Sequence, residues 1–191
     1  MPAGDEEVRI RKMTEADLPK VKEIDRELVG PERALSWPLR VEAHWWVYRG
    51  MPNFVAEAGS ELVGFVMGDI RGTEYGTDVS GWIDMIGVLP RSQGRGIGRR
   101  LVEAFCRECE VQGVRARVVF METDKRLAGF WSSLGFRKGN ILSYELKLRG
   151  QCADTPSSMP KRLELTKGNL SRLAAGAPSP ERGARAQEGT G

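Results

Sequence analysis

The stretch "GVLPRSQGRGIGRRLVEAF", residues 87–105, marks the point where a strand gives way to a helix. An apolar run over residues 82–89 predicts a buried strand, which ends at Pro90. A helical pattern begins a few residues later and places Ile97, Leu101 and Phe105 on one face. Between the two, glycines alternate along the loop, at Gly94, Gly96 and Gly98. The chain therefore needs a backbone almost free of side chains at this junction.

Alternating glycines favour an anion site in this loop. Without Cβ atoms the loop tolerates positive φ angles, and its backbone N–H groups can converge on one anion. The helix that follows adds unpaired N–H groups and the positive end of its dipole. Three arginines lie around the helix start: Arg95, Arg99 and Arg100. A diphosphate is the ligand that this pattern favours, and a plain tight turn is the alternative reading of the glycines.

The spacing excludes two common phosphate loops. A Walker loop requires Gly-Lys followed by Ser or Thr, and that sequence is absent here. The dinucleotide fingerprint G-x-G-x-x-G is not met either, because the spacing after Gln93 is G-x-G-x-G. The loop also lies in mid-chain, after a predicted antiparallel meander. Dinucleotide or nucleotide binding is therefore the weakest of the ligand hypotheses.

The rest of the chain alternates between strand and helix periodicity. Thr14 and Asp17 form a pattern like a capping box, and Pro31 and Pro38 are expected to break the segment after the first helix. Strands are predicted at 8–13, 53–58, 61–72, 79–89, 114–123 and 140–148, and helices at 14–28, 40–50, 97–109 and 125–134. The order β-α-α-β-β-β-α-β-α-β predicts a mixed α/β (α+β) sheet with helices packed on it.

Composition and charge narrow the class of protein. The 191 residues are 40% hydrophobic and 29% charged, as in a soluble globular domain. No apolar run is long enough for a membrane helix, and the N-terminus shows no signal-peptide pattern, so we expect a cytoplasmic protein that does not engage membranes. Residues 149–191 hold seven of the 29 basic residues but four of the 26 acidic ones, so they carry the whole net charge of +3. A neutral body argues against a nucleic-acid surface.

The C-terminal residues 150–191 are predicted to be a disordered tail. They contain no aromatic residue and are rich in Gly, Ala, Pro and Ser, so they cannot bury enough apolar area to offset their ordering entropy. The domain is accordingly expected to span residues 1–149. Within it, Cys106 and Cys109 lie in a helical pattern without two nearby further ligands, which predicts reduced thiols rather than a metal site.

At this level of detail the chain resembles the GNAT superfamily of acetyl-CoA-dependent N-acetyltransferases. The segment "QGRGIG", residues 93–98, fits the family signature Q/R-x-x-G-x-G/A. The segment "WIDMIGVLP", residues 82–90, resembles the family's fourth strand, and "FWSSLGF", residues 130–136, resembles its LY-x-x-LGF segment. The resemblance covers about residues 7–148. It implies a mixed, mostly antiparallel sheet of about six or seven strands flanked by about four helices.

The resemblance also implies where acetyl-CoA, the cosubstrate, would bind. In the family, the glycine loop holds the diphosphate and the fourth strand pairs its backbone with the pantetheine arm. Gly87 is the expected place for a bulge that splays this strand from the next. Asp124 and Trp131 stand where the family often has an Asn that contacts pantetheine and a Tyr that protonates the thiolate. The residues assigned to the cosubstrate are Ile86, Gly87, Val88, Gln93, Gly94, Arg95, Gly96, Ile97, Gly98, Arg99, Asp124 and Trp131.

Three side chains are candidates for proton transfer to or from the reacting groups. Asp84 lies among apolar residues of the fourth strand, on the face of Ile86 if no bulge intervenes. Glu122, near the end of the fifth strand, and Tyr144, in the last strand, are the other two. Each has a structural alternative: a hydrogen bond within the sheet, an exposed surface position and core packing, respectively. His44, the sole histidine, is expected to be a packing or surface residue.

The acceptor is expected to enter beside residues 29–50, which carry aromatic and basic side chains: Arg33, Trp37, Arg40, Trp45, Trp46 and Arg49. These side chains suit a small molecule, or a peptide or protein amine, with an apolar body and a carboxylate, although the tryptophans suit a core equally well. The predicted function is acetyl transfer from acetyl-CoA to such an amine. The alternative is a non-catalytic acyl-CoA-binding sensor or interaction module. The acceptor's identity, the acyl chain length and the oligomeric state, a homodimer included, stay open.

Overall fold

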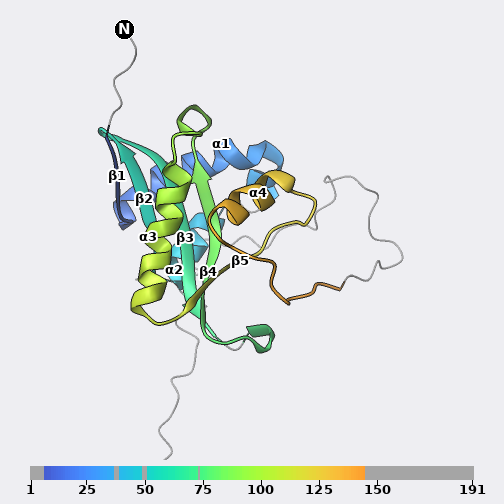
Figure 1. Cartoon of the computed structure of the whole chain (residues 1–191). Helices are drawn as coiled ribbons and strands as arrows, with labels where there is room; N and C mark the ends of the chain where they lie inside the picture. The colour runs from blue at the N-terminus through green and yellow to red at the C-terminus, as the bar shows by residue number, and fades with distance from the viewer. Residues whose placement is uncertain (1–6, 37–38, 49–50, 73, 145–191) are drawn as a thin grey trace, which may run out of the picture. The chain divides into compact units, whose positions relative to one another are not determined.

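The computed structural model describes residues 7–36, 39–48, 51–72 and 74–144. These residues form one five-stranded sheet in the order β1-β2-β3-β4-β5 (Figure 1). The strands are β1 (Val8–Lys12), β2 (Phe54–Ala58), β3 (Glu61–Arg71), β4 (Ser80–Val88) and β5 (Arg115–Val118). Neighbouring strands are antiparallel except for β4 and β5, which are parallel. The mixed, mostly antiparallel sheet predicted from the sequence is therefore confirmed.

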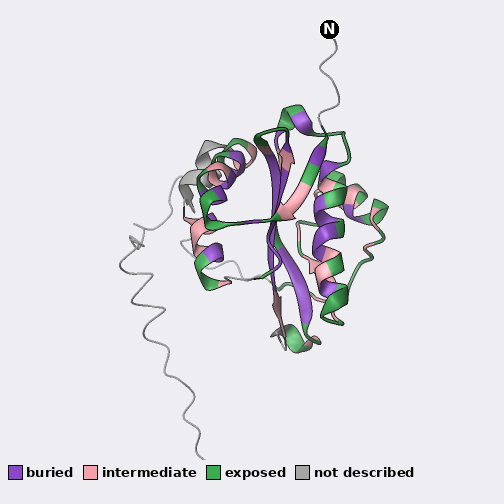
Figure 2. Ribbon diagram, turned by 90° about the vertical axis from the view of Figure 1, so that its left-hand side faces the viewer, coloured by how far each residue is buried: buried purple, intermediate pink, exposed green. Residues whose placement is uncertain are grey.

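Helices cover both faces of this sheet (Figure 2). They are α1 (Leu18–Ser36), α2 (Arg40–Val47), α3 (Ile97–Val111) and α4 (Lys125–Ser133). A Cβ added at Gly81 would meet Cys109 and Phe105 of α3, whereas one added at Gly87 would meet Leu28 of α1. The helices α1 and α3 therefore pack on opposite faces. No described helix is long and apolar enough to cross a membrane.

The first helix begins where the capping residues predict. The backbone N–H of Thr14 donates to the Asp17 carboxylate at 2.7 Å, and one turn of 3₁₀ helix, η1 (Glu15–Asp17), leads into α1. Arg11 of β1 also donates two hydrogen bonds to Asp17, which lowers the pKa of that carboxyl to about 2. The break expected at Pro31 does not occur, because the backbone stays helical to Ser36. Pro38 lies outside the described residues.

The hydrophobic core fills both sides of the central strands. Its fully buried members include residues of α1, α2, the central strands and α3: Val21, Ile24, Val41, Val55, Phe65, Val66, Met67, Ile97, Leu101, Val102 and Phe105. Val63, Val66 and Met67 of β3 are buried, as the central position of that strand in the sheet requires. The apolar residues that recur at helical spacing after the glycine loop form one face of α3, and this face packs on the sheet.

The structure has fewer strands than the sequence predicts. The fifth strand stops at Val118 instead of running to residue 123, and residues 140–144 adopt no strand in the part of the chain that the structure describes. The remainder of the predicted last strand, residues 145–148, lies outside that part. So does the predicted tail over residues 150–191. The described sheet therefore ends at β5, one strand short of the lower predicted number.

Candidate active site

The glycine loop adopts the conformation that its sequence requires. Gly94 and Gly96 have φ angles of 78° and 76°, in the left-handed region that residues with a Cβ rarely adopt. Gly96 is the N-cap of α3, so the first N–H groups of that helix point out of the loop without intrahelical partners. A Cβ added at either glycine would meet nothing within 4 Å. The loop is thus an open, side-chain-free cradle at the positive end of a helix dipole.

Gln93 holds this loop in place. Its side-chain Nε2 donates to the Val88 carbonyl at 2.8 Å, and Arg126 of α4 donates to its Oε1 at 2.6 Å. The amide therefore ties together the end of β4, the loop and the start of α4. Arg99 also reaches α4, where its guanidinium donates to the Ser133 carbonyl at 3.3 Å. Gln93 thus shapes the cradle through its side chain.

The strand that leads to the loop leaves one edge unpaired. The parallel pairing of β4 with β5 covers only Ser80–Ile83, against Arg115–Val118. Beyond Ile83, β4 continues for five residues and keeps its pairing with β3 on the other edge. No described strand pairs with Asp84–Val88 on the β5 side. An extended, amide-bearing ligand could add there as a further strand and reach the glycine loop at its end.

The bulge that accompanies this splay lies at Asp84, not at Gly87 as expected. Met67 pairs with Met85 and Gly68 pairs with Ile83, so Asp84 is the extra residue. The faces of the strand agree with this, because Gly81 faces α3 and Gly87 faces α1 although they lie six positions apart, which in a regular strand would put both on one face. Gly87 is small for another reason, since a Cβ there would lie 2.5 Å from Leu28.

Asp84 is consequently turned away from the face of Ile86 and joins a cluster of polar side chains. Its carboxylate accepts two hydrogen bonds from Arg71, at 2.9 and 3.1 Å. Arg71 also pairs with the buried Asp69 and stacks over the Trp82 ring, with 5.0 Å from its Cζ to the ring centroid. The Asp84 side chain keeps 30% of its surface exposed. The Asp84 carboxylate is therefore held in place by Arg71 and is still reachable from solvent.

His44 of α2 is the residue of this cluster that the sequence did not reveal. Its Nδ1 lies 3.7 Å from the Asp84 carboxylate, and its Nε2 lies 3.4 Å from the Gly68 carbonyl. Burial lowers the pKa of the imidazole, an effect that Asp84 opposes, so the ring is neutral near pH 7. Of the two expected positions, packing or surface, the structure shows the buried one, and the sequence did not indicate its neighbour, Asp84.

The other two proton-transfer candidates lie elsewhere on the surface. The Glu122 side chain is 83% exposed and pairs with Lys138 at 3.0 Å, which lowers the pKa of its carboxyl. Tyr144 is 91% exposed and lies outside any strand, so the expected core packing is wrong. The described contacts join neither residue to the cluster around Asp84.

The two positions that depart from the family pattern both have structural roles on α4. Asp124 is the N-cap of the helix, and its carboxylate accepts the Leu127 N–H at 2.9 Å. Trp131 is buried and packs edge-on against Phe130 and Phe136, with ring centroids 5.0 and 5.1 Å away. Its indole N–H has no hydrogen-bond partner among the described residues.

The described contacts do not join the two thiols of α3 to this site. Cys106 and Cys109 are free thiols, and burial raises the pKa of each, that of Cys109 to about 11. Both thiols therefore stay protonated near pH 7 and are poor nucleophiles. No group of residues in the described ranges could hold a metal ion. In the expected acceptor wall Trp45 is buried and Trp46 is 41% exposed, whereas Trp37 and Arg49 lie outside the described residues, as does the Arg33 side chain.

Comparisons with known proteins agree with this geometry. Residues 18–136 match the model of the acetyltransferase (GNAT) family. A mycothiol acetyltransferase of Catenulispora acidiphila is 29% identical over 110 residues, 56% of this chain, and one of Streptomyces avermitilis is 31% identical over 84 residues, 44% of this chain. The matches cover 34% and 26% of those relatives, so this chain spans about a third of their length or less.

Solved structures show the same fold. Aminoglycoside N-acetyltransferase AAC(6')-Iy in complex with CoA superimposes with a TM-score of 0.63 at 20% identity, over 77% of this chain and 98% of that one. Ribosomal-protein-alanine N-acetyltransferase from Brucella melitensis gives a TM-score of 0.59 at 17% identity, over 74% and 99%. A family model that matches most of the domain, a splayed β4 and a glycine loop at the start of α3 together place this chain in the GNAT family of acetyltransferases.

Proposed function

We propose that this chain transfers an acetyl group from acetyl-CoA to a primary amine, by direct attack within a ternary complex. The observation that carries the proposal is the unpaired edge of β4, which begins at the Asp84 bulge and ends at the glycine loop. A candidate base thus lies at one end of an extended slot and an anion cradle at the other. The family relationship and the relatives named acetyltransferases support this reading.

The proposal assigns each part of coenzyme A to residues along the unpaired edge of β4 and the glycine loop. The diphosphate would rest on the N–H groups of residues 94–98, where Gly94 and Gly96 leave the space above the backbone open. The exposed side chains of Arg95, Arg99 and Arg100 would add positive charge around it. The amides of the pantetheine arm would pair with Ile86–Val88, and Trp131 would pack behind the channel. Asp124 caps the start of α4, which Arg126 ties to Gln93 of the loop.

The proton balance of the reaction assigns a task to Asp84. An amine that enters as an ammonium ion loses one proton before its nitrogen attacks the thioester carbon. It loses a second when the C–S bond breaks, and that proton ends on the sulfur of the released thiol. Asp84 would accept the first proton, directly or through one water. His44, neutral and 3.7 Å behind it, would then be hydrogen-bonded by the protonated carboxyl through Nδ1.

The described site holds no obvious acid that could pass the amine's second proton to the leaving sulfur. Trp131 occupies the position where the family often has Tyr, and an indole N–H does not release a proton near neutral pH. A coenzyme thiol titrates near the value for cysteine, about 8.5, so the thiolate can leave first and take its proton from water. We therefore infer catalysis that does not depend on a protein acid at this step.

We also propose the remaining features of the protein from its sequence. The catalytic domain would comprise residues 1–149, with residues 150–191 as a basic, disordered extension and the cytoplasm as the site of action. The acceptor would be a small molecule, as the names of the mycothiol and aminoglycoside enzymes indicate for those proteins, or the amine of a peptide. A homodimer would be compatible with this domain.

Purified protein tests the activity directly. Acetyl-CoA is incubated with a panel of primary amines, and free thiol is measured together with the mass of the acetylated product. We expect transfer to at least one class of amine and a loss of transfer in Asp84→Asn. Trp131 stands where the family often has Tyr, and this difference favours a second candidate function, an acyl-CoA-binding module without activity. Tight acetyl-CoA binding without turnover across the whole panel would establish that alternative instead.

A further inference from the structure

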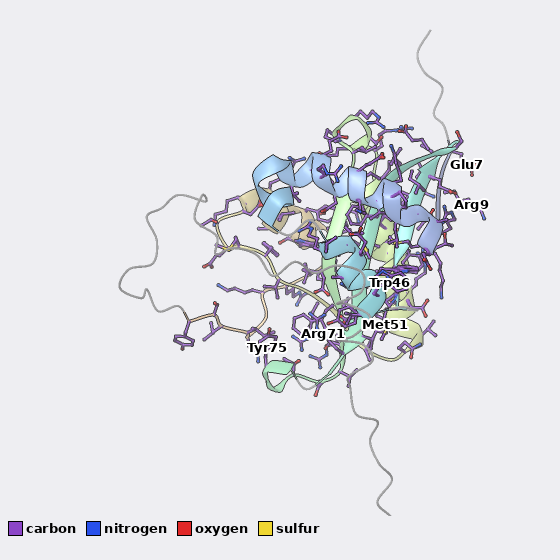
Figure 3. The ribbon with its side chains drawn as sticks, turned by 180° about the vertical axis from the view of Figure 1, so that it is seen from behind. Glu7, Arg9, Trp46, Met51, Arg71 and Tyr75 are labelled. Carbon is purple, nitrogen blue, oxygen red and sulfur yellow. The ribbon has the colours of Figure 1, made fainter. Side chains whose placement is uncertain are left out.

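A polar cavity of about 330 Å³ lies beside the start of β5. It is lined by the turn over residues 75–78, by Arg115 and Arg117 of β5, and by residues 140–142. The function proposed above assigns nothing to this cavity. Figure 3 shows Tyr75 and Arg71 close to one another, on the side of the sheet that carries α1 and α2 (Figure 3).

The register of the sheet places the cavity's arginines on the same face as Asp84. Arg117 pairs with Trp82 of β4, so their side chains leave the sheet on the same side. The Trp82 ring lies between two guanidinium groups, 5.8 Å from Arg117 and 5.0 Å from Arg71. Arg71 in turn holds the carboxylate of Asp84 at 2.9 Å. The Trp82 ring and the Arg71 guanidinium therefore lie between the cavity and the Asp84 carboxylate.

The cavity carries an excess of positive charge. Arg117 donates through Nε to the Ser80 hydroxyl at 2.9 Å, which fixes its guanidinium and leaves its terminal nitrogens for another partner. Within the described residues neither Arg115 nor Arg117 forms an ion pair with a carboxylate. Asp78 supplies the one acidic side chain among the residues that line the cavity. Two guanidinium groups against one carboxylate favour an anionic ligand, and their planar forks suit a carboxylate.

We propose that this cavity binds a carboxylate of the acceptor, so that the substrates of this chain are amines that also carry an acidic group. The inference rests on the proposed acetyl transfer, because it takes the reacting amine to lie at Asp84. The Trp82 ring and the Arg71 guanidinium lie between the Arg117 guanidinium and the Asp84 carboxylate. That separation exceeds the span of an α-amino acid. It favours an amine and a carboxylate joined by several bonds, as in an ω-amino acid or a short peptide.

Matched acceptors test the proposal. The ω-amino acids with three to six carbons are compared with their primary amides, because each amide keeps the amine and the chain but removes the negative charge. We expect wild-type kcat/KM to favour the carboxylate over the amide by at least tenfold for the longer chains. The double variant Arg115→Gln/Arg117→Gln should lose that preference while turnover of the amides stays the same. Arg107→Gln, which removes a positive charge from α3 on the opposite face, should keep it.

A binding measurement separates this inference from the proposed activity. Glutarate, a dicarboxylate with no amine, should raise the melting temperature of wild-type protein but not that of the double variant. If the double variant unfolds, Arg115→Gln alone serves, since Arg115 is exposed and makes no described hydrogen bond. Equal turnover of acids and amides would overturn the inference and leave acetyl transfer intact. Absence of turnover with every amine would overturn the activity, and the glutarate result would then decide the cavity.

Discussion

Replacing Gly96 by Asp or by Asn gives a direct measure of the anion cradle. The two side chains have nearly the same shape, and both tolerate the left-handed φ of 76° better than other residues with a Cβ. A Cβ at Gly96 meets nothing within 4 Å, so neither side chain clashes with a neighbour. The strain of the left-handed backbone should lower the free energy of unfolding by about 1 kcal/mol in each variant. The two variants should therefore fold equally well and differ only in charge.

The difference in coenzyme A affinity follows from Coulomb's law. A carboxylate about 6 Å from a diphosphate with two negative charges is repelled by about 1.5 to 5 kcal/mol, for effective dielectric constants between 80 and 20. Since 1.4 kcal/mol is tenfold in affinity, Gly96→Asp should bind coenzyme A at least about tenfold more weakly than Gly96→Asn. Titration calorimetry at low salt measures both dissociation constants. The ratio should shrink as salt screens the charge. Equal affinities in two folded variants would refute the assignment of the diphosphate to this loop.

Four further substitutions or titrations test other parts of the structure. Asp84→Asn should lower kcat by a hundredfold or more with little change in acetyl-CoA affinity, whereas Glu110→Gln on the exposed side of α3 should leave both unchanged. Burial lowers the pKa of His44 in the folded state, so the unfolded state binds a proton at higher pH. The free energy of unfolding should therefore fall as pH drops below about 6.5, and it should fall less in His44→Gln. The NMR signal of the single histidine should titrate below about 6.5. Gly87→Ala should reduce the free energy of unfolding by about 1–3 kcal/mol in denaturant titrations, since its Cβ would lie 2.5 Å from Leu28 and 2.8 Å from Phe65. The pKa of the Asp17 carboxyl is lowered to about 2, so its contribution to the free energy of unfolding should be complete above about pH 4. In wild type this contribution should be lost as pH falls from about 4 to about 2, and Asp17→Asn should not show that loss.

The parts of the fold that were predictable from sequence are those that local chemistry decides. Gly96 has the left-handed φ expected of a glycine in this loop, and the start of α1 follows from the reciprocal bonds of Thr14 and Asp17. Gly135, which follows the end of α4, also has a left-handed φ, of 86°, as is common for a glycine after a helix. Pro31 misled because its fixed φ of about −65° is itself helical, and the backbone of α1 stays helical through it to Ser36.

The cluster around Asp84 was not predictable, because its members come from α2, β3 and β4. No local pattern relates His44 to Asp84, which lie 40 positions apart in the sequence. The sequence does not indicate the position of the bulge either, because no residue type in β4 is specific to it. The bulge was expected at Gly87, which pairs regularly with Phe65. Only the register of β3 against β4 reveals that Asp84 is the extra residue. Asp84 was still recognisable as a candidate, because an acid among apolar strand residues needs a purpose.

The single extra residue at Asp84 offers one explanation for both the proposed base and the proposed cosubstrate slot. An unbulged β4 would place Asp84 on the face of Ile86, and residues 81 and 87 would then face the same helix. The bulge reverses this, so that Gly87 accommodates α1 while Asp84 reaches His44 and Arg71 beneath α2. A bulge also strengthens the local twist, and the pairing with β5 ends at the residue just before it. Deleting Asp84 should therefore restore a regular strand and abolish acetyl-CoA binding, whereas Asp84→Asn removes the carboxylate alone and should leave that binding intact. If the deletion variant folds and still binds acetyl-CoA as tightly as wild type, the bulge does not create the slot.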